Sequence, residues 1–295
     1  SPFNFKSSDA TSPVQIILAD GIYIDKRDVK PRLQNAIRRL AAYSNPQFYQ
    51  NLALGSSNKK TPRIVYDGYD EGNHIVIPRG CFDELKSHLY EAEIPCRIID
   101  KRQSGRAINV SFNGTLYQEQ LVAAERLSAH DIGILAAATA FGKTVIGAYL
   151  IARRKVNTLV LVNSAEIMNN WVQDLDRFLT IQEELPTYTT PKGRIKRRDS
   201  VIGTFSSQKK AATGIIDIAM IGSLGKEDNI NPMVRDYGMV IVDECHHAAA
   251  TTFENVLRAS AAKYVYGMSA TVKRGDKQER RLFMQLGPIR HRYTT

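Results

Sequence analysis

The sequence is poor in cysteine, and it has no long apolar run. Its three cysteines, Cys81, Cys96 and Cys245, are too few and too scattered for a disulfide framework or a zinc knuckle. No stretch approaches the roughly 18 apolar residues of a membrane-spanning helix, and no signal-peptide pattern opens the chain. These absences argue against a disulfide-stabilised secreted domain and against a membrane partner, and they predict a cytoplasmic, reducing setting.

The composition is that of an ordinary globular protein. Of the 295 residues, 43% are apolar and 24% are charged, and the length suits two domains. The formal net charge is +10, which strengthens the attraction for polyanions without specifying a fold. The charge therefore favours a nucleic acid as a partner.

The strongest local pattern is the stretch Ile132 to Thr144, IGILAAATAFGKT, which is followed by the helical pattern VIGAYLIARR. An apolar strand, a loop of small residues and a helix that opens on Lys-Thr form a geometry that binds nucleotide phosphates. Unpaired amides at the helix N-terminus face the anion, Lys143 can reach the β- and γ-phosphates, and the Thr144 hydroxyl can ligate Mg²⁺. The strict pattern also requires glycine at Ala137, so a chance Gly-Lys-Thr at a helix start is the alternative.

A second pattern, MVIVDECHH, runs from Met239 to His247. Four apolar residues predict a buried strand that ends in Asp243 and Glu244. Paired carboxylates at a strand end can supply one ligand for Mg²⁺ and one group that orients or deprotonates the attacking water. Taken alone, the pair could equally be a solvated strand end. Together and in this order, the two patterns predict a site for ATP and Mg²⁺.

Further segments match a known set of motifs. Ser269-Ala270-Thr271 follows another apolar run, and Tyr117-Gln118 precedes the phosphate loop. With these motifs the sequence resembles the superfamily 2 helicases and translocases over residues 113–295. The matching segments are Thr139 to Thr144 (motif I), Val160 to Trp171 (motif Ia), Ile218 to Leu224 (motif Ib), Asp243 to His246 (motif II in its DExH form) and Ser269 to Thr271 (motif III).

Within this superfamily the sequence is most similar to the branch of XPB-like and UvsW-like DNA helicases and of the helicase subunits of restriction and phage-conflict systems. It departs from many members at Ala140, where glycine is common, and at Asn163, where proline is common. Neither departure removes a phosphate or metal ligand. The resemblance implies the first RecA-like lobe of an ATP-dependent motor.

The resemblance also implies roles for individual residues. Lys143 and Thr144 would hold phosphates and Mg²⁺, Asp243 would hold Mg²⁺ through water, and Glu244 would position the hydrolytic water. Ser269 and Thr271 would couple hydrolysis to movement, so their double alanine variant should keep ATPase activity and lose unwinding. The other implied contacts are to the nucleotide, from Gln118 (adenine), Thr139, Ala140, Phe141, Gly142 and His246 (γ-phosphate), and to nucleic acid, from Ser223.

Apolar runs that alternate with helical stretches predict the fold of the C-terminal part. Such alternation is typical of an α/β domain with a mainly parallel sheet and right-handed crossovers. The motifs then lie at the carboxyl ends of the strands, where open α/β sheets bind ligands. The predicted strands are residues 132–136, 158–162, 200–203, 216–221, 239–242 and 264–268.

Residues 1–112 are predicted to form a smaller, mixed α/β domain ahead of the motor domain at residues 113–295. Nothing in this N-terminal segment has a catalytic pattern. Arg38 and Arg39, with Tyr43, Phe48 and Tyr49, have the composition of a patch that grips single-stranded nucleic acid. A core helix with a solvated charged face explains the same residues, so both interpretations remain.

The segment PKGRIKRRD, residues 191–199, is strongly basic. Solvated charge is one interpretation. The other is a loop that contacts the phosphate backbone of DNA, in which case binding should weaken with salt. The candidate DNA-contacting residues are Arg194, Lys196, Arg197 and Arg198.

We therefore predict the N-terminal portion of an ATP-dependent DNA helicase or translocase. Motif III lies about 25 residues before the last residue, so the second lobe, which supplies arginine fingers, is expected on a longer chain. Without that lobe the chain should hydrolyse ATP poorly. An RNA helicase of the same superfamily and a non-catalytic nucleic-acid-binding module are the alternatives. A small-molecule kinase is disfavoured by motifs Ia, Ib and III.

Overall fold

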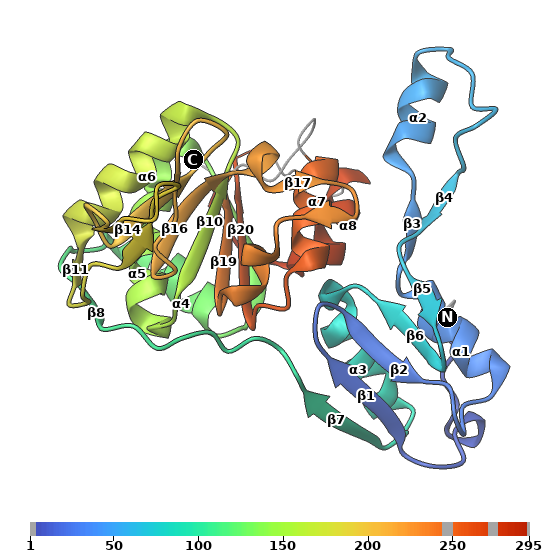
Figure 1. The fold of residues 1–295 in the computed structure, drawn as a ribbon. Helices are drawn as coiled ribbons and strands as arrows, with labels where there is room; N and C mark the ends of the chain where they lie inside the picture. Colours follow the sequence, from blue (N-terminus) through green and yellow to red (C-terminus); the bar gives the residue numbers. More distant parts are fainter. Residues whose placement is uncertain (1–3, 244–249, 271–276, 294–295) are drawn as a thin grey trace. The chain divides into compact units, whose positions relative to one another are not determined.

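The computed structural model describes residues 4–243, 250–270 and 277–293 (Figure 1). The predicted site residues Glu244, His246 and Thr271 lie outside the described residues. The other predicted site residues lie within them.

The chain forms two compact units. Unit 1 comprises Ser1–Arg102 and Val272–Gly287, and unit 2 comprises Gln103–Thr271 and Pro288–Thr295. The division predicted at residue 112 differs from this one in its boundary and in the assignment of residues 272–287. The helix inside that segment goes with unit 1 because its apolar face completes the unit 1 core. Each unit is described by itself.

Unit 2 is built on a mainly parallel eight-stranded sheet. Its strand order is β15-β14-β16-β10-β19-β20-β9-β21, in which the β14–β15 pair is antiparallel and the other neighbours are parallel. Six strands lie within two residues of the predicted positions, and the α/β class is confirmed. The strands are β9 (Ile132–Ala137), β10 (Thr158–Val162), β14 (Ile202–Phe205), β15 (Lys210–Ala211), β16 (Ile216–Met220), β19 (Met239–Asp243), β20 (Tyr264–Ser269) and β21 (Ile289–Tyr293).

Three helices pack on one face of this sheet and form its main core (Figure 1). They are α4 (Gln118–Ser128), α5 (Lys143–Arg154) and α6 (Ala165–Phe178). On α6 the buried residues are Met168, Trp171 and Leu175, and their spacing of three and four residues defines one apolar stripe. Helix α7 (Ala250–Ala259) precedes β20.

The register of the sheet aligns the ends of its central strands. Asp243 of β19 pairs with Met268 of β20, and Ser269 of β20 pairs with Ala136 of β9. Because parallel strands end at the same edge of a sheet, the carboxyl ends of β9, β19 and β20 lie side by side. Motifs I, II and III are therefore carried by one edge.

Helix α5 is fixed at its far end by Arg154. The guanidinium lies 4.2 Å from the ring centroid of Tyr264 and donates to the Tyr266 hydroxyl at 2.6 Å. Burial raises the pKa of Tyr266 to about 12, so this hydroxyl stays protonated at neutral pH and donates to the His130 carbonyl. The contacts tie α5 to strand β20 and so set the direction of its N-terminus.

Short elements make up the connections of unit 2. Strands β12 and β13 form a hairpin, and the basic segment at residues 191–199 contains β13 and most of the connection that precedes it. No helix among the described residues is long and apolar enough to cross a membrane. The short elements are β8 (Val110–Phe112) paired with β11 (Leu179–Ile181), β12 (Thr187–Thr189) with β13 (Ile195–Arg197), β17 (Gly225–Lys226) with β18 (Asn229–Ile230), and the 3₁₀ helices η3 (Thr139–Phe141), η4 (Ile221–Leu224) and η5 (Pro232–Asp236).

Unit 1 has a five-stranded sheet of order β5-β6-β2-β1-β7. Its core includes Phe283 and Met284 of α8 (Lys277–Leu286), although α8 lies far along the sequence. Arg280 of α8 donates to Glu84 at 2.7 Å, which adds an ion pair to this apolar packing. The other elements are η1 (Ser7–Asp9), β1 (Val14–Leu18), β2 (Ile22–Asp25), α1 (Pro31–Arg39), β5 (Tyr69–Glu71), β6 (His74–Ile77), η2 (Arg79–Cys81), α3 (Phe82–Glu91) and β7 (Cys96–Asp100).

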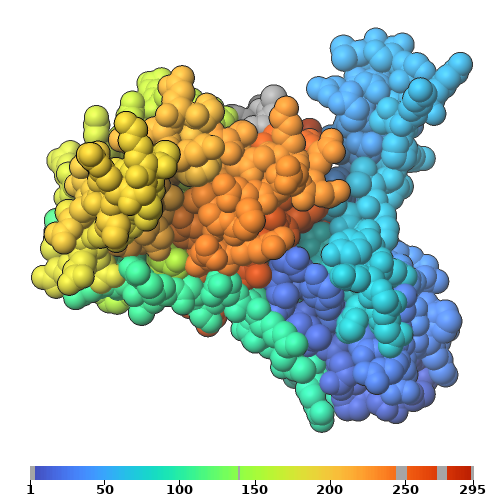
Figure 2. All heavy atoms as spheres, viewed as in Figure 1, coloured from blue at the N-terminus to red at the C-terminus, as the bar shows by residue number. Residues whose placement is uncertain are grey.

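A narrow arm projects from the sheet of unit 1 (Figures 1 and 2). It consists of the paired strands β3 (Ala42–Ser44) and β4 (Ile64–Tyr66), with α2 (Pro46–Ala53) between them. Within the part of the chain that the structure describes, no residue of α2 is buried. The sequence of the arm, residues 42–66, contains three basic residues and no acidic one.

Candidate functional site

The loop after β9 turns sharply into helix α5. The 3₁₀ helix η3 leads to Gly142, whose φ of 88° lies in the left-handed region. This backbone angle favours glycine, and a Cβ on Gly142 would lie 2.4 Å from Nε2 of Gln120, which would have to move away from the Phe141 carbonyl to which it donates. Gly142 is the N-cap residue of α5 and makes no side-chain hydrogen bond to its first turn, and the N-terminus of a helix favours an anion.

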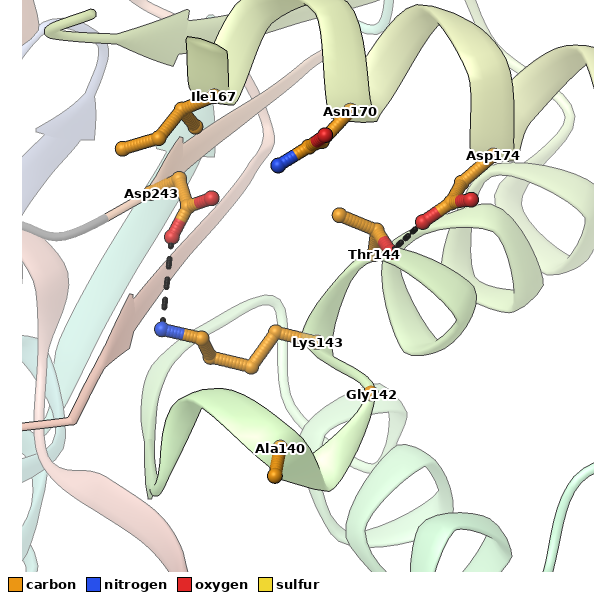
Figure 3. Close-up of a pocket in the computed structure, with 8 residues that line it drawn as sticks. All are labelled: Ala140, Gly142, Lys143, Thr144, Ile167, Asn170, Asp174 and Asp243. Carbon is orange, nitrogen blue, oxygen red and sulfur yellow. Dashed lines mark hydrogen bonds and ion pairs between the residues drawn. The ribbon is translucent and has the colours of Figure 1, made fainter.

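Lys143 and Asp243 meet across the predicted site (Figure 3). The Nζ of Lys143, at the start of α5, lies 3.7 Å from Oδ1 of Asp243, the last residue of β19. Their side chains are only 6% and 7% exposed. An ammonium and a carboxylate this deeply buried must compensate each other's charge. A bound phosphate could replace Asp243 as the partner of Lys143, and a bound cation could replace Lys143 as the partner of Asp243.

The Thr144 hydroxyl, the other predicted Mg²⁺ ligand, points at a neighbouring helix. It donates to Oδ2 of Asp174 on α6 at 2.5 Å (Figure 3). Asp174 was not among the residues predicted from the sequence. A helix residue three positions after an apolar anchor faces the same side, so the spacing from Trp171 to Asp174 was the available signal.

Asp243 has a second partner that the sequence analysis missed. The indole Nε1 of Trp171 donates to Oδ2 of Asp243 at 2.7 Å, and the ring is fully buried. A Cβ on Gly147 of α5 would lie 2.4 Å from the edge of that ring, so the absence of a side chain there makes room for the indole. Trp171 is thus a core residue that also contacts the site.

The structure brings Gln120 to the phosphate loop and leaves Gln118 exposed at the start of α4. The Gln120 carboxamide donates to the Phe141 carbonyl at 2.9 Å and accepts from the Tyr117 amide at 2.9 Å. The adenine contact of Gln118 stays a prediction. Gln120 could not be distinguished from Gln118 by sequence because both lie at the start of one helix.

A pocket of about 320 Å³ lies between these groups (Figure 3). Its chemistry suits a magnesium nucleotide, because it combines a helix N-terminus, one lysine, and hydroxyl and carboxylate oxygens, the ligands that Mg²⁺ prefers. Among the described residues no cluster of three or more His, Cys, Asp or Glu side chains could enclose a metal. The lining residues are Ala140, Gly142, Lys143, Thr144, Ile167, Asn170, Asp174 and Asp243.

The other predicted nucleotide residues lie at the same edge. Phe141 stacks on Tyr293 of β21 with ring centroids 4.4 Å apart, which packs the end of η3 against the edge strand. Ser269 is fully buried at the end of β20. Thr139 is the first residue of η3. Neither Phe141 nor Ser269 lines the pocket, so their predicted roles remain predictions.

The predicted nucleic-acid residues do not line the pocket. Arg194, Lys196, Arg197 and Arg198 belong to the β12–β13 hairpin or adjoin it, and the whole of β13 is exposed. The guanidinium of Arg198 lies 3.9 Å from the ring centroid of Tyr188. Ser223 is half-buried in η4. The hairpin therefore presents its basic residues to solvent.

Comparison with known proteins places the chain among helicases. A family model described as "Type III restriction enzyme, res subunit" matches residues 90–274. The chain is 24% identical to a "DNA 3'-5' helicase XPB" of Mycobacterium tuberculosis over 286 residues, which cover 89% of this chain and 48% of that one. It is 30% identical to a "Putative helicase 109L" of Invertebrate iridescent virus 3 over 182 residues, covering 60% and 51%.

Two further similarities bear on nucleic-acid type and fold. A "Putative ATP-dependent RNA helicase L396" of Acanthamoeba polyphaga mimivirus is 24% identical over 75% of this chain and 39% of that one. The crystal structure of the UvsW helicase from bacteriophage T4 has a TM-score of 0.61 at 12% identity, covering 96% of this chain and all of that one, which shows a shared fold. The chain spans about half the length, or less, of these curated relatives.

Proposed function

The chain belongs to the family of the Type III restriction enzyme res subunit, and on that premise we propose that it is the ATP-binding lobe of a DNA helicase or translocase. The observation that carries the proposal is the buried pairing of Lys143 with Asp243 beside the N-terminus of α5. A helix start and a strand end that are remote in sequence there supply one cation and one carboxylate to a shared pocket, which is the arrangement that phosphoryl-transfer sites require.

We assign the phosphate contacts to the start of α5. The amides of Gly142, Lys143 and Thr144 offer donors, and Lys143 exchanges the carboxylate of Asp243 for a phosphate oxygen. Ala140 lines the pocket beside them, and Thr139 and Phe141 precede them on the loop. When bound, Mg²⁺ would neutralise negative charge on the β- and γ-phosphates. Thr144 and Asp243 are the residues that would hold it.

Hydrolysis requires further groups. Glu244 is assigned to orient the attacking water, His246 to contact the γ-phosphate, and Gln118 to contact adenine, all by resemblance. Ser269 and Thr271 are assigned to coupling. An arginine finger from a second lobe contributes roughly 10³–10⁵ in rate. We propose that such a lobe is a partner of this one, and the greater length of the curated relatives supports this proposal. This chain alone is then expected to hydrolyse ATP weakly.

We assign nucleic-acid binding to two exposed basic surfaces. One is the β12–β13 hairpin with Arg194, Lys196, Arg197 and Arg198, to which Ser223 of η4 is added by resemblance. The other is the arm at residues 42–66, which carries exposed aromatic and aliphatic side chains and no acidic residue. Lysine and arginine neutralise backbone phosphates, and exposed rings can stack on unpaired bases.

DNA is the proposed substrate because the XPB relative that covers most of this chain bears a DNA helicase name. The mimivirus relative bears an RNA helicase name, which makes RNA the second candidate. Stimulation of ATPase activity by duplex DNA and by RNA, measured on the protein with both lobes, separates them. Greater stimulation by DNA is expected, and greater stimulation by RNA would reverse the assignment.

The nucleotide proposal is tested by equilibrium binding of a fluorescent ATP analogue to the chain in the presence of Mg²⁺. Lys143→Ala and Asp243→Asn should each weaken binding strongly, whereas Lys226→Ala, on an exposed strand outside the pocket, should leave it unchanged. Equal affinity in the wild type and in the two pocket variants would refute the site.

A further inference from the structure

Helix α6 presents one face to the pocket. Ile167, Asn170, Trp171 and Asp174 follow the spacing i, i+3, i+4, i+7, which places them along one stripe of a helix. Ile167, Asn170 and Asp174 line the pocket (Figure 3), and Trp171 lies buried beside them. The stripe therefore runs along the wall of the pocket opposite the phosphate loop.

Two residues of this stripe contact the two side chains assigned to Mg²⁺. Trp171 donates to Asp243 at 2.7 Å, and Asp174 accepts from Thr144 at 2.5 Å. The two ligands come from β19 and α5, and α6 contacts both of them through side-chain hydrogen bonds. Its position fixes the direction of both groups at once.

The Trp171 contact determines which oxygen of Asp243 is available. The indole holds Oδ2, and Lys143 lies nearest to Oδ1. When Lys143 turns to a phosphate, Oδ1 is the oxygen released toward the pocket while Oδ2 stays anchored. Because one oxygen of the Asp243 carboxylate is held by Trp171, the side chain cannot rotate away from the pocket. A cation that binds Asp243 therefore loses less free energy to ordering this side chain.

The Asp174 contact determines the direction of the Thr144 proton. A hydroxyl that ligates a cation must present a lone pair to it, and its proton must then find another acceptor. Asp174 is that acceptor. Its carboxylate also adds negative charge to the wall of the pocket, which favours a divalent cation.

We propose that Trp171 and Asp174 are positioning residues for Mg²⁺, acting through Asp243 and Thr144 respectively. This inference rests on the proposed function of the pocket and adds the element that tunes its metal affinity. Loss of groups that orient metal ligands typically lowers metal affinity by about 10- to 100-fold. Variants at these two positions should therefore need about 10-fold more Mg²⁺, or Mn²⁺ as its paramagnetic substitute, for half-saturation.

The experiment measures binding of the metal itself. Free and bound Mn²⁺ are counted by electron paramagnetic resonance with the chain and ADP, and the wild type is compared with Asp174→Asn, which keeps the shape of the side chain and removes its charge. Asp176→Asn is the matched control, because Asp176 is an exposed carboxylate on another face of the same helix. Nucleotide affinity without metal is measured in parallel.

Trp171 is tested by replacement with benzothienylalanine, which keeps the ring shape and substitutes sulfur for the N–H donor. Trp171→Phe is the simpler companion variant. Because Trp171 is the single tryptophan of the chain, the wild-type emission also reports directly on the site, and Mn²⁺ should quench it in the presence of ADP.

We expect the affinity for Mn²⁺ to be about 10-fold lower in Asp174→Asn and in the benzothienylalanine variant. The affinity for nucleotide without metal should not change in these variants, and the Asp176→Asn control should bind Mn²⁺ as the wild type does. Unchanged Mn²⁺ affinity in folded Asp174→Asn would overturn it even if the buried Trp171 variants failed to fold. If the wild type bound no nucleotide at all, the proposed function itself would fail, which is a distinct result.

Discussion

The pocket and the β12–β13 hairpin are two polar regions of the same unit, and they are organised in opposite ways. In the pocket, Lys143 and Asp243 are almost fully buried, and Asp243 also accepts a hydrogen bond from the indole of Trp171. In the hairpin, β13 is exposed throughout, and Ile195 is 76% exposed. The pocket should therefore depend on single atoms, whereas the hairpin should depend on its summed charge.

Removal of one charge from the pocket should have the largest effect. Lys143→Ala leaves the buried Asp243 carboxylate without its ammonium, which should lower the free energy of unfolding of unit 2 by about 3 kcal/mol. Lys143→Met combined with Asp243→Asn should recover most of this stability without recovering nucleotide binding. Urea denaturation followed by Trp171 fluorescence measures the stability of the single and the double variant. If the double variant were as unstable as the single one, the pair would not be the compensating interaction.

A pair of glycines sharpens the comparison. Gly142 and Gly193 have similar φ values, 88° and 79°, but a Cβ on Gly142 would lie 2.4 Å from Gln120, whereas no described atom lies within 4 Å of one on Gly193. Gly193→Ala should lower stability by about 1 kcal/mol, the backbone cost alone. Gly142→Ala should cost about 1–3 kcal/mol more and weaken nucleotide binding. Equal losses in thermal denaturation would contradict the packing argument.

The hairpin should respond to salt and charge. Changing Arg194, Lys196, Arg197 and Arg198 together to alanine should reduce the slope of log K against log salt by up to about 3.6, since each phosphate contact contributes about 0.9. DNA affinity should fall without sequence preference, and nucleotide affinity should not change. Filter binding or fluorescence anisotropy over a salt series measures the slope. An unchanged slope would remove the hairpin from the DNA-binding surface.

The smallest effect is expected at Tyr188. Tyr188→Leu removes the ring beneath Arg198, a half-buried cation–π contact of about 1 kcal/mol. Thermal stability should fall by no more than that amount, and nucleotide binding should be unaffected. A loss comparable to that of Lys143→Ala would break the distinction between the two regions.

The sheet and the family could be predicted because both depend on strands. Continuous apolar runs are a strong signal for buried strands, and parallel strands bring their carboxyl ends together, so Lys143 and Asp243 could be brought to one site from sequence alone. The family match confirms the predicted relationship to superfamily 2 helicases. The six predicted strands lie within two residues of their positions in the structure.

Contacts made by helices could not be predicted in the same way. The hydrogen bonds of Trp171 and Asp174 depend on how α6 is rotated about its axis, and the choice between Gln118 and Gln120 depends on the first turn of α4. The assignment of α8 to unit 1 depends on long-range packing of Phe283 and Met284, which leaves no local pattern beyond an amphipathic helix. These features require the tertiary structure.

The most direct test of the account is a crystal structure of the chain with ADP and Mg²⁺. The account predicts the β-phosphate at the N-terminus of α5, with Lys143 Nζ within hydrogen-bonding distance of it and displaced from Asp243. Diphosphate bound elsewhere, or bound while Lys143 keeps its contact with Asp243, would contradict it.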